Sequence, residues 1–339
     1  MLKIGIIGAG VMGNRHEGRI ADYGAQVVAV HDIHLPAAQE LGTRAGAKIV
    51  TDDLERFFDA EMDGLIITTP PPVRLEPVRR ACERGIHLMI EKPPALNMAD
   101  GRACLAHIED AEVIAAVSFQ LRYGSIYERL RELLADETVH LVHTVCTVEY
   151  YLTFRMSPWF LQRQISGGPL AEQAIHILDC ARFVMGNVKP VQAHAIGAKN
   201  MALDRAEFDA ENAIQMMYEL ENGVFGTHIN HCGTKGNGFE LEVIGPQLRL
   251  RADARGGRNG DRIVGHLHGN DFSEPVPAEN SIGLDKIHAW LRAIETGDRS
   301  LIRSDFGDAM HTLALIEAAI RSQDTGGFVK VDSNPNPIG

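Results

Sequence analysis

Residues 2–13 read Leu-Lys-Ile-Gly-Ile-Ile-Gly-Ala-Gly-Val-Met-Gly, and this stretch decides the fold. The apolar run at 2–7 has the length of a buried strand, and residues 14–23 have the pattern of a helix. Between them lies a G-x-G-x-x-G pattern at 8–13. A glycine loop that leads from a strand into a helix is typical of a nucleotide-binding βαβ unit.

The three glycines of this pattern have separate roles in a dinucleotide site. Gly8 permits the tight turn, Gly10 lets a pyrophosphate approach the backbone, and Gly13 lets the helix lie close to the strand. The pyrophosphate would accept hydrogen bonds from the N–H groups at the helix N-terminus, including those of Val11 and Met12. The alternative is a glycine turn in an α/β fold that binds no nucleotide.

A second strand, expected at 27–30, is followed by Asp32, which lies 19 residues after Gly13. A carboxylate at this position accepts hydrogen bonds from ribose hydroxyls and repels a 2′-phosphate. Ile33 and His34 offer no arginine that would reverse this preference. The sequence therefore predicts NAD rather than NADP as the cofactor.

Strands and helices alternate as far as residue 120, which predicts a doubly wound, mostly parallel Rossmann sheet in residues 1–120. Further strands are expected at 48–51, 64–69, 87–90 and 113–119, and helices at 35–45, 53–58, 73–84 and 100–107. Right-handed crossovers bring the carboxyl ends of the strands to one edge, where ligands bind. Thr69 and Pro70 lie at this edge and are expected to contact the cofactor.

The run Glu91-Lys92-Pro93-Pro94 also falls at the ligand edge, because it follows the strand expected at 87–90. A lysine at the end of a buried strand can hydrogen-bond a substrate hydroxyl and stabilise a developing alkoxide. We therefore expect Glu91 and Lys92 to lie in the cofactor-binding site, and Lys92 also to be a catalytic residue. The alternative is a solvated surface ion pair between the two side chains.

After residue 120, strands are joined by short turns, which predicts an α/β domain at 121–339 with an open, mostly antiparallel sheet. Its expected strands are 140–151, 190–199, 212–221, 224–232, 239–245, 247–251, 262–268 and 328–331, and its expected helices are 169–185, 285–296 and 305–324. A sheet with one open face makes a homodimer or homotetramer the expected assembly.

The helix expected at 169–185 carries Glu172 and His176 four residues apart, and thus on one face. An acid beside an imidazole makes a general-base pair, because the acid orients the ring while the other ring nitrogen takes a proton. Asp179 lies one further turn along and is a weaker candidate for substrate contact. The alternative is a Glu–His pair on the surface of the helix.

Four other side chains are weaker candidates for contacts with substrate. Arg122 and Tyr123 follow the last strand of the first domain, and Arg155 and Trp159 lie in a loop that could supply an apolar face. The alternatives are an ion pair between the domains for Arg122, and loop packing or a subunit contact for the loop residues.

The composition narrows the class of partner. The chain has 33 Lys and Arg against 45 Asp and Glu, a formal net charge of −12, so nucleic acid and membrane surfaces are not expected partners. Five widely spaced cysteines without a C-x-x-C pair predict a reducing compartment and a cytoplasmic location. His228, His231 and Cys232 resemble metal ligands, but positions 228 and 231 point to opposite faces of a strand, so no metal site is predicted.

The order of these motifs resembles the Gfo/Idh/MocA oxidoreductases, a family that includes glucose–fructose oxidoreductase and inositol dehydrogenase. The resemblance covers nearly the whole chain and is carried by GIIGAGVMGNRH, Asp32, EKP and GGPLAEQAIHILD. It implies a Rossmann domain, an α/β domain with an open sheet, and hydride transfer between a nicotinamide and a hydroxyl-bearing carbon of a sugar, polyol or cyclitol. The family's lysine falls on Lys92, its helix acid on Glu172 and its helix histidine on His176.

In the mechanism that the resemblance implies, His176 removes the hydroxyl proton, Lys92 hydrogen-bonds the same oxygen, and Glu172 positions the substrate or the ring. Three residues depart from the family pattern: Glu172 replaces an Asp, Ala174 a glycine and Arg74 a histidine. Two other functions stay open: a redox-neutral NAD-dependent enzyme that cleaves glycosidic bonds, and a non-catalytic sensor of NAD or sugar.

Overall fold

The chain forms two compact units, seen in a computed structural model that describes residues 1–149, 158–199, 209–236, 238–254 and 260–332. The first unit comprises Met1–Ala95, Ala99–Ser118 and Leu284–Gly307. The second unit comprises Leu96–Met98, Phe119–Gly283 and Asp308–Gly339. Among the described helices, none combines the length and the apolar character that a membrane crossing requires.

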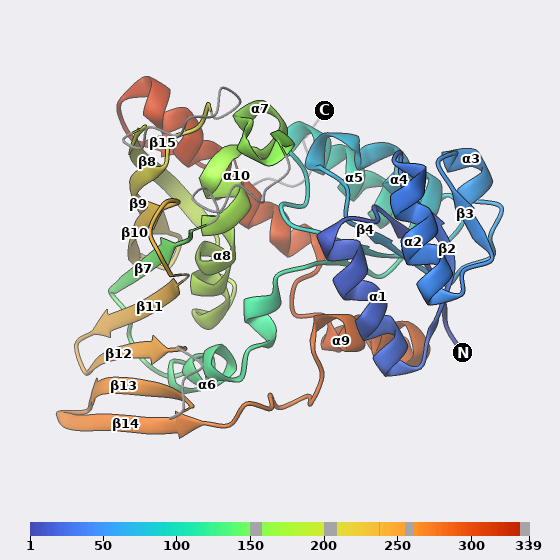
Figure 1. The fold of residues 1–339 in the computed structure, drawn as a ribbon. Coiled ribbons are helices and arrows are strands. Elements are labelled where there is room, and N and C mark those ends of the chain that lie inside the picture. Colours follow the sequence, from blue (N-terminus) through green and yellow to red (C-terminus); the bar gives the residue numbers. More distant parts are fainter. Residues whose placement is uncertain (150–157, 200–208, 237, 255–259, 333–339) are drawn as a thin grey trace. The chain divides into compact units, whose positions relative to one another are not determined.

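A six-stranded sheet with the order β3-β2-β1-β4-β5-β6 forms the centre of the first unit (Figure 1). Its strands are β1 (Lys3–Ile7), β2 (Gln26–His31), β3 (Ile49–Thr51), β4 (Gly64–Ile67), β5 (His87–Ile90) and β6 (Ala115–Val117). All of these neighbours pair in parallel, which confirms the predicted doubly wound fold. The central strands are almost entirely apolar because both faces of the sheet are covered.

The helices of the first unit lie between these strands along the chain, except for α9 and η5, which come after all of them. They are α1 (Val11–Tyr23), α2 (Leu35–Ala45), α3 (Leu54–Phe57), η1 (Pro71–Val73), α4 (Leu75–Cys82), α5 (Met98–Ala111), α9 (Lys286–Thr296) and η5 (Arg299–Leu301). Ile20 of α1, Leu41 of α2 and Trp290 of α9 pack in one cluster with Ile4 and Ile6 of β1. These three helices therefore share a core with the strand that leads into the glycine loop.

The segment that carries α9 belongs to the first unit, although the sequence pattern predicts that all residues after 120 lie in the second domain. The physical reason is the apolar face of α9, on which Trp290 is fully buried against the parallel sheet. Gly64 of β4 makes room for this ring, because a Cβ at Gly64 would lie only 2.6 Å from Cη2 of Trp290. The first unit is thus completed by residues from late in the chain.

The second unit contains a nine-stranded sheet with the order β14-β13-β12-β11-β7-β10-β9-β8-β15. Its strands are β7 (Leu141–Thr147), β8 (Pro190–Ala198), β9 (Ala213–Leu220), β10 (Phe225–His231), β11 (Gly238–Gly245), β12 (Leu248–Asp253), β13 (Asp261–Leu267), β14 (Asn270–Val276) and β15 (Val329–Lys330). The described pairs are antiparallel except for β7 and β10, which confirms the prediction of a mostly antiparallel sheet.

Helices cover one face of this sheet and leave apolar side chains exposed on the other. The helical segments are η2 (Gln120–Tyr123), α6 (Ser125–Leu133), η3 (Pro158–Leu161), α7 (Arg163–Ser166), η4 (Leu170–Ala174), α8 (Ile175–Val184) and α10 (Phe306–Thr325). Burial alternates along β10, so that Gly226 and His228 are buried while Phe225 and Ile229 are exposed.

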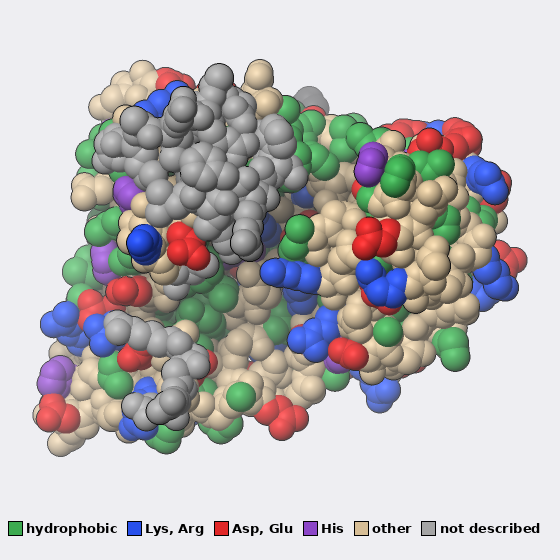
Figure 2. All heavy atoms as spheres, viewed as in Figure 1, with side chains coloured by type: hydrophobic (Ala, Val, Ile, Leu, Met, Phe, Trp, Pro, Cys, Tyr) green, Lys and Arg blue, Asp and Glu red, His purple; other side chains and the backbone are tan. Residues whose placement is uncertain are grey.

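On the face of the molecule drawn in Figure 2, side chains of both charge signs are interspersed.

Candidate active site

The glycine loop between β1 and α1 is shaped by close contacts within the chain at two of its three glycines. A Cβ on Gly8, whose φ is +101°, would lie 2.4 Å from Oγ1 of Thr68, and a Cβ on Gly13 would lie 2.0 Å from the carbonyl oxygen of Gly8. A Cβ on Gly10 would meet no described atom within 4 Å. Internal packing therefore explains Gly8 and Gly13, whereas a ligand that approaches the backbone closely would explain Gly10.

Helix α1 begins at Val11, directly after this loop, with Gly10 as its N-cap residue. Within the described part of the chain, no side chain caps this N-terminus, and its first turn holds no acidic residue. First-turn N–H groups, such as those of Val11 and Met12, have no acceptor inside a helix and can bind an anion. The loop and the helix N-terminus thus fit the diphosphate of a dinucleotide.

Asp32 follows β2 and ties its end to the glycine loop. Its Oδ2 accepts a hydrogen bond from the backbone N–H of Ala9 (2.7 Å), and its Oδ1 accepts one from the backbone N–H of His34 (2.8 Å). Each carboxylate oxygen has a second lone pair that can accept a ribose hydroxyl. The position of Asp32 therefore fits the ribose contact that the sequence predicts.

The carboxylate of Glu91, at the end of β5, is buried in a polar cluster of the first unit. Its Oε1 accepts a hydrogen bond from Oγ of Ser118 (2.6 Å), and it lies 2.7 Å from Nε2 of His16 and 3.5 Å from Nζ of Lys286. Burial alone would raise the pKa of Glu91, but Lys286 and His16 outweigh burial and hold this pKa well below its usual value. The alternative prediction, a solvated surface ion pair between Glu91 and Lys92, is therefore wrong, because the Glu91 carboxylate is buried.

Three of these supporting residues were missed by the sequence analysis. His16 is 75 positions away from Glu91, Ser118 is 27 positions away, and Lys286 is 168 positions away from Ser118. No local spacing links residues so far apart, and only the packing of α1, β6 and α9 brings them together. These contacts make the Glu91 side chain a support of the loop that follows β5, and a contact of Glu91 with the cofactor stays a prediction.

A buried arginine joins the two loops at the carboxyl ends of β4 and β5. Arg74 donates to the carbonyl oxygen of Thr69 through Nε (3.0 Å) and Nη2 (2.6 Å), and through Nη1 to the carbonyl oxygens of Glu91 and Pro93. Lys92 lies between these last two residues, is partly exposed, and precedes a cis peptide bond. Thr69 and Lys92 are thus held in neighbouring loops at the ligand edge of the parallel sheet.

Glu172 and His176 lie on the helical segment that the sequence predicted at 169–185, but this segment is not a single α-helix. Residues 170–174 form the π-helix η4, and α8 follows from Ile175, so that Glu172 sits on the π-turn and His176 at the start of α8. Both side chains are buried, which excludes a pair on the helix surface. A π-turn within a helix often marks a functional site.

The imidazole of His176 lies against two aromatic rings of the second unit. Its centroid is 6.4 Å from that of Phe119 and 5.9 Å from that of Phe239, with interplanar angles of 88° and 69°. The side chain is 6% exposed. This packing restricts the orientation of the ring, and a fixed ring orientation is what a general base needs.

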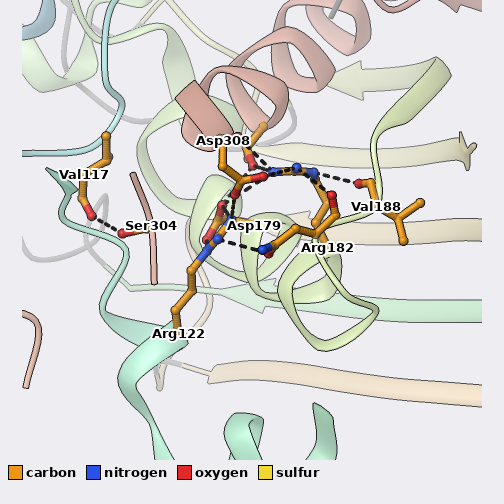
Figure 3. Close-up of polar contacts among 9 residues, drawn as sticks. Val117, Arg122, Asp179, Arg182, Val188, Ser304 and Asp308 are labelled. Atoms are coloured by element: carbon orange, nitrogen blue, oxygen red, sulfur yellow. Dashed lines mark hydrogen bonds and ion pairs between the residues drawn. The ribbon is translucent and has the colours of Figure 1, made fainter. Parts of the chain in front are cut away.

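Arg122 and Asp179 are partners of each other within the second unit (Figure 3). Arg122 donates through Nε to Oδ2 of Asp179 (2.7 Å) and through Nη2 to Oδ1 (2.6 Å), and Nη2 also pairs with Oδ2 of Asp308 (2.6 Å). Arg182 pairs with the other oxygen of Asp308 at 2.8 Å. Both Arg122 and Asp179 are fully buried in this network, and their contact with substrate stays a prediction.

The remaining candidates differ in what the structure shows of them. Tyr123 is buried, and its carbonyl oxygen accepts a hydrogen bond from Asn280 (2.7 Å). Trp159 is partly exposed and packs against Phe160, with ring centroids 5.6 Å apart. Arg155 lies outside the described residues.

The two histidines set aside as metal ligands lie on opposite faces of β10, as predicted. His228 is buried, and its Nδ1 lies 2.9 Å from Oγ1 of Thr144. His231 is partly exposed, and its Nδ1 lies 2.7 Å from Oγ1 of Thr234. Each ring is therefore engaged with a threonine hydroxyl on its own side of the sheet.

Comparison with known proteins matches both units to one family. Residues 2–119 match the model described as "Oxidoreductase family, NAD-binding Rossmann fold", and residues 131–331 match "Oxidoreductase family, C-terminal alpha/beta domain". An inositol 2-dehydrogenase of Rhizobium meliloti (strain 1021) is 25% identical over 331 residues, which cover 95% of this chain and 96% of the relative. A D-glucoside 3-dehydrogenase of Escherichia coli (strain K12) is 29% identical over 243 residues, 68% of each chain.

A solved structure shows the same fold. The crystal structure of GenD2 from gentamicin A biosynthesis, in complex with NAD, has a TM-score of 0.82 and 22% sequence identity to this chain. The match covers 98% of this chain and 96% of that chain.

Proposed function

This chain belongs to the Gfo/Idh/MocA family of oxidoreductases, and from that premise we propose that it is an NAD-dependent dehydrogenase of a sugar, polyol or cyclitol. The observation that carries the proposal is the burial of both Glu172, which lies on a π-turn, and His176, which lies on the helix that follows it. An acid and an imidazole are costly to bury, and a proton acceptor is what the oxidation of a hydroxyl requires.

The residues that would hold the cofactor lie in the first unit. The loop from Gly8 to Gly13 and the N-terminus of α1 fit the diphosphate, Asp32 fits the adenosine ribose, and Thr69 and Pro70 lie at the same edge of the sheet. When bound, NAD supplies the hydride acceptor at C4 of its nicotinamide. The charge of Asp32 supports NAD over NADP, because a 2′-phosphate would meet a carboxylate.

The proposal assigns three roles to side chains of this chain. His176 takes the proton from a secondary or anomeric hydroxyl of the substrate as general base. Lys92 donates a hydrogen bond to the same oxygen and stabilises the negative charge that develops there. Glu172 holds the substrate or the imidazole in position.

The test is a panel of sugars, polyols and cyclitols with NAD and with NADP, read by the absorbance of the reduced cofactor. We expect reduction of NAD with at least one substrate, and a loss of roughly 10²–10⁴-fold in turnover for His176→Ala. The control is His266→Ala, because His266 is exposed and pairs with Asp271 at the surface. Full turnover by His176→Ala would refute the assigned base, and substrate turnover at constant NADH would indicate the redox-neutral reaction instead.

The open face of the second sheet supports self-association. Phe225 of β10 and Leu141 of β7 are paired in register, and both are exposed on this face together with Ile229 and Met217. Beside these apolar residues, Arg249 pairs with Glu242 at 2.9 Å, so the same face offers both charge signs. An exposed apolar patch of this kind marks an interaction site, and we propose a second copy of this chain as its partner.

A further inference from the structure

Arg74 is a buried cation that the proposed chemistry does not use. It lies between η1 and α4 in the first unit, and only 3% of its surface is exposed. Burying a guanidinium is costly unless its N–H groups are matched by acceptors. Here Nε, Nη1 and Nη2 all donate to backbone carbonyl oxygens, which belong to Thr69, Glu91 and Pro93.

Two of these carbonyl groups flank Lys92 along the chain. Nη1 donates to the carbonyl oxygen of Glu91 before Lys92, and to that of Pro93 after it. Fixing the carbonyl groups on both sides of a residue restricts its φ and ψ, and so fixes the direction in which its side chain leaves the backbone. The side chain of Glu91 is held separately by His16 and Ser118.

The third acceptor connects Lys92 to the neighbouring loop. Nε and Nη2 both donate to the carbonyl oxygen of Thr69, so one planar guanidinium spans the loops after β4 and β5. A lysine in place of Arg74 would keep the charge, but its single ammonium lacks the rigid fork that reaches separate acceptors at once. We propose that Arg74 is a positioning residue, which sets the orientation of Lys92 relative to the Thr69 loop.

This inference rests on the function proposed above. The test therefore measures how the effect of replacing Arg74 on turnover depends on the presence of Lys92. The variants are Arg74→Met, Lys92→Ala and the double variant, assayed for kcat and KM with the substrate found in the panel. The matched control is Arg79→Met, because Arg79 lies on the adjoining helix α4 and pairs only with surface acids in the contacts seen for it, Glu76 and Glu83.

Misplacing a reacting group by about 1 Å can lower the rate by on the order of 10²-fold, and we expect a loss of that size in kcat for Arg74→Met. Residues that act as one unit are not additive, so Arg74→Met should cost less than about threefold when Lys92 is already alanine. Arg79→Met should keep the parent kcat. The positioning role would be overturned if Arg74→Met lowered kcat by the same factor with Lys92 as with alanine at position 92, or if it did not lower kcat in the parent protein. A purely structural role would lower the melting temperature, and the loss in kcat would then not depend on Lys92.

A second measurement does not depend on turnover. Amide hydrogen exchange in the segments 65–76 and 88–98 should be faster by about tenfold or more in Arg74→Met and unchanged in Arg79→Met, because the two loops would lose their shared donor. A parent protein that is inactive on the whole panel contradicts the proposed dehydrogenase function, and the exchange rates then decide the role of Arg74. Equal exchange in Arg74→Met and the parent protein would refute that role.

Discussion

Replacing Arg122 with methionine removes the central cation of the buried ion network in the second unit. Arg122 is 0% exposed, and its Nη2 lies 2.6 Å from Asp179 and 2.6 Å from Asp308. Methionine fills much of the same volume but leaves the buried carboxylate of Asp179 and the partly exposed carboxylate of Asp308 without this cation. Removing one partner of a buried ion pair costs about 3–5 kcal/mol of the free energy of unfolding.

The remaining contacts place the expected loss at the lower end of this range. Arg182 still pairs with Asp308 at 2.8 Å, and Oγ1 of Thr312 still donates to Oδ1 of Asp179 at 2.9 Å. We therefore expect Arg122→Met to lower the free energy of unfolding by about 3 kcal/mol. Replacing Asp179 with leucine in addition, while Asp308 keeps Arg182 as its partner, should recover part of this loss, because an apolar substitute for a buried ion pair can be neutral or stabilising.

Urea unfolding measures this loss, followed by tryptophan fluorescence. The chain has two tryptophans, of which Trp159 lies in the second unit and Trp290 in the first, so a Trp290→Phe background reports on the second unit alone. The control in the same background is Arg129→Met, whose partly exposed pair with Glu274 should contribute less than about 1 kcal/mol. An equal, small loss for Arg122→Met and the control would show that the buried network does not stabilise this unit.

Three further predictions concern the cofactor, pH and assembly. Gly10→Ala should keep the melting temperature and weaken NAD binding measured by calorimetry, whereas Gly18→Ala in the exposed interior of α1 should raise stability by about 0.5–1 kcal/mol and leave NAD binding unchanged; equal affinities of Gly10→Ala and the parent protein would disprove the diphosphate site. Burial lowers the pKa of His228 from 6.5 to about 3, so between these values the unfolded chain binds a proton that the folded chain does not. Stability therefore falls as pH falls, by at most about 1.4 kcal/mol per pH unit, and urea midpoints should show that His228→Leu removes this slope. Phe225→Glu should convert the proposed oligomer to monomers in light scattering, and an unchanged mass would rule out the open sheet face as the interface.

The local features of the fold could be predicted from the sequence, because short-range patterns determine them. The glycine loop, the alternation of strands and helices, and the apolar run of β4 each depend on a few adjacent residues. Strand β14, which reads Asn-Asp-Phe-Ser-Glu-Pro-Val, was missed because its residues do not alternate between apolar and polar. The pattern at 125–133 was also passed over, although α6 buries Ile126 and Leu130 on one side.

The contacts of the candidate site could be predicted only in part. The spacing of Glu172 and His176 placed both on one helical segment, but it could not reveal the π-turn or the rings of Phe119 and Phe239. Arg122 was assigned to substrate because its partner Asp179 is 57 positions away. Charged residues that pair over such distances look identical in sequence to charged residues that bind ligands.

The placement of α9 in the first unit has a consequence for how the chain is made. The first 118 residues leave the ribosome without Trp290 and Lys286, which later pack against β4 and approach the Glu91 carboxylate. Until residue 307 has emerged, the nascent parallel sheet therefore exposes the apolar surface that α9 will cover. Synthesis of this protein is thus expected to depend on chaperones that shield that surface, and a gene fragment that ends at residue 118 should yield an insoluble product.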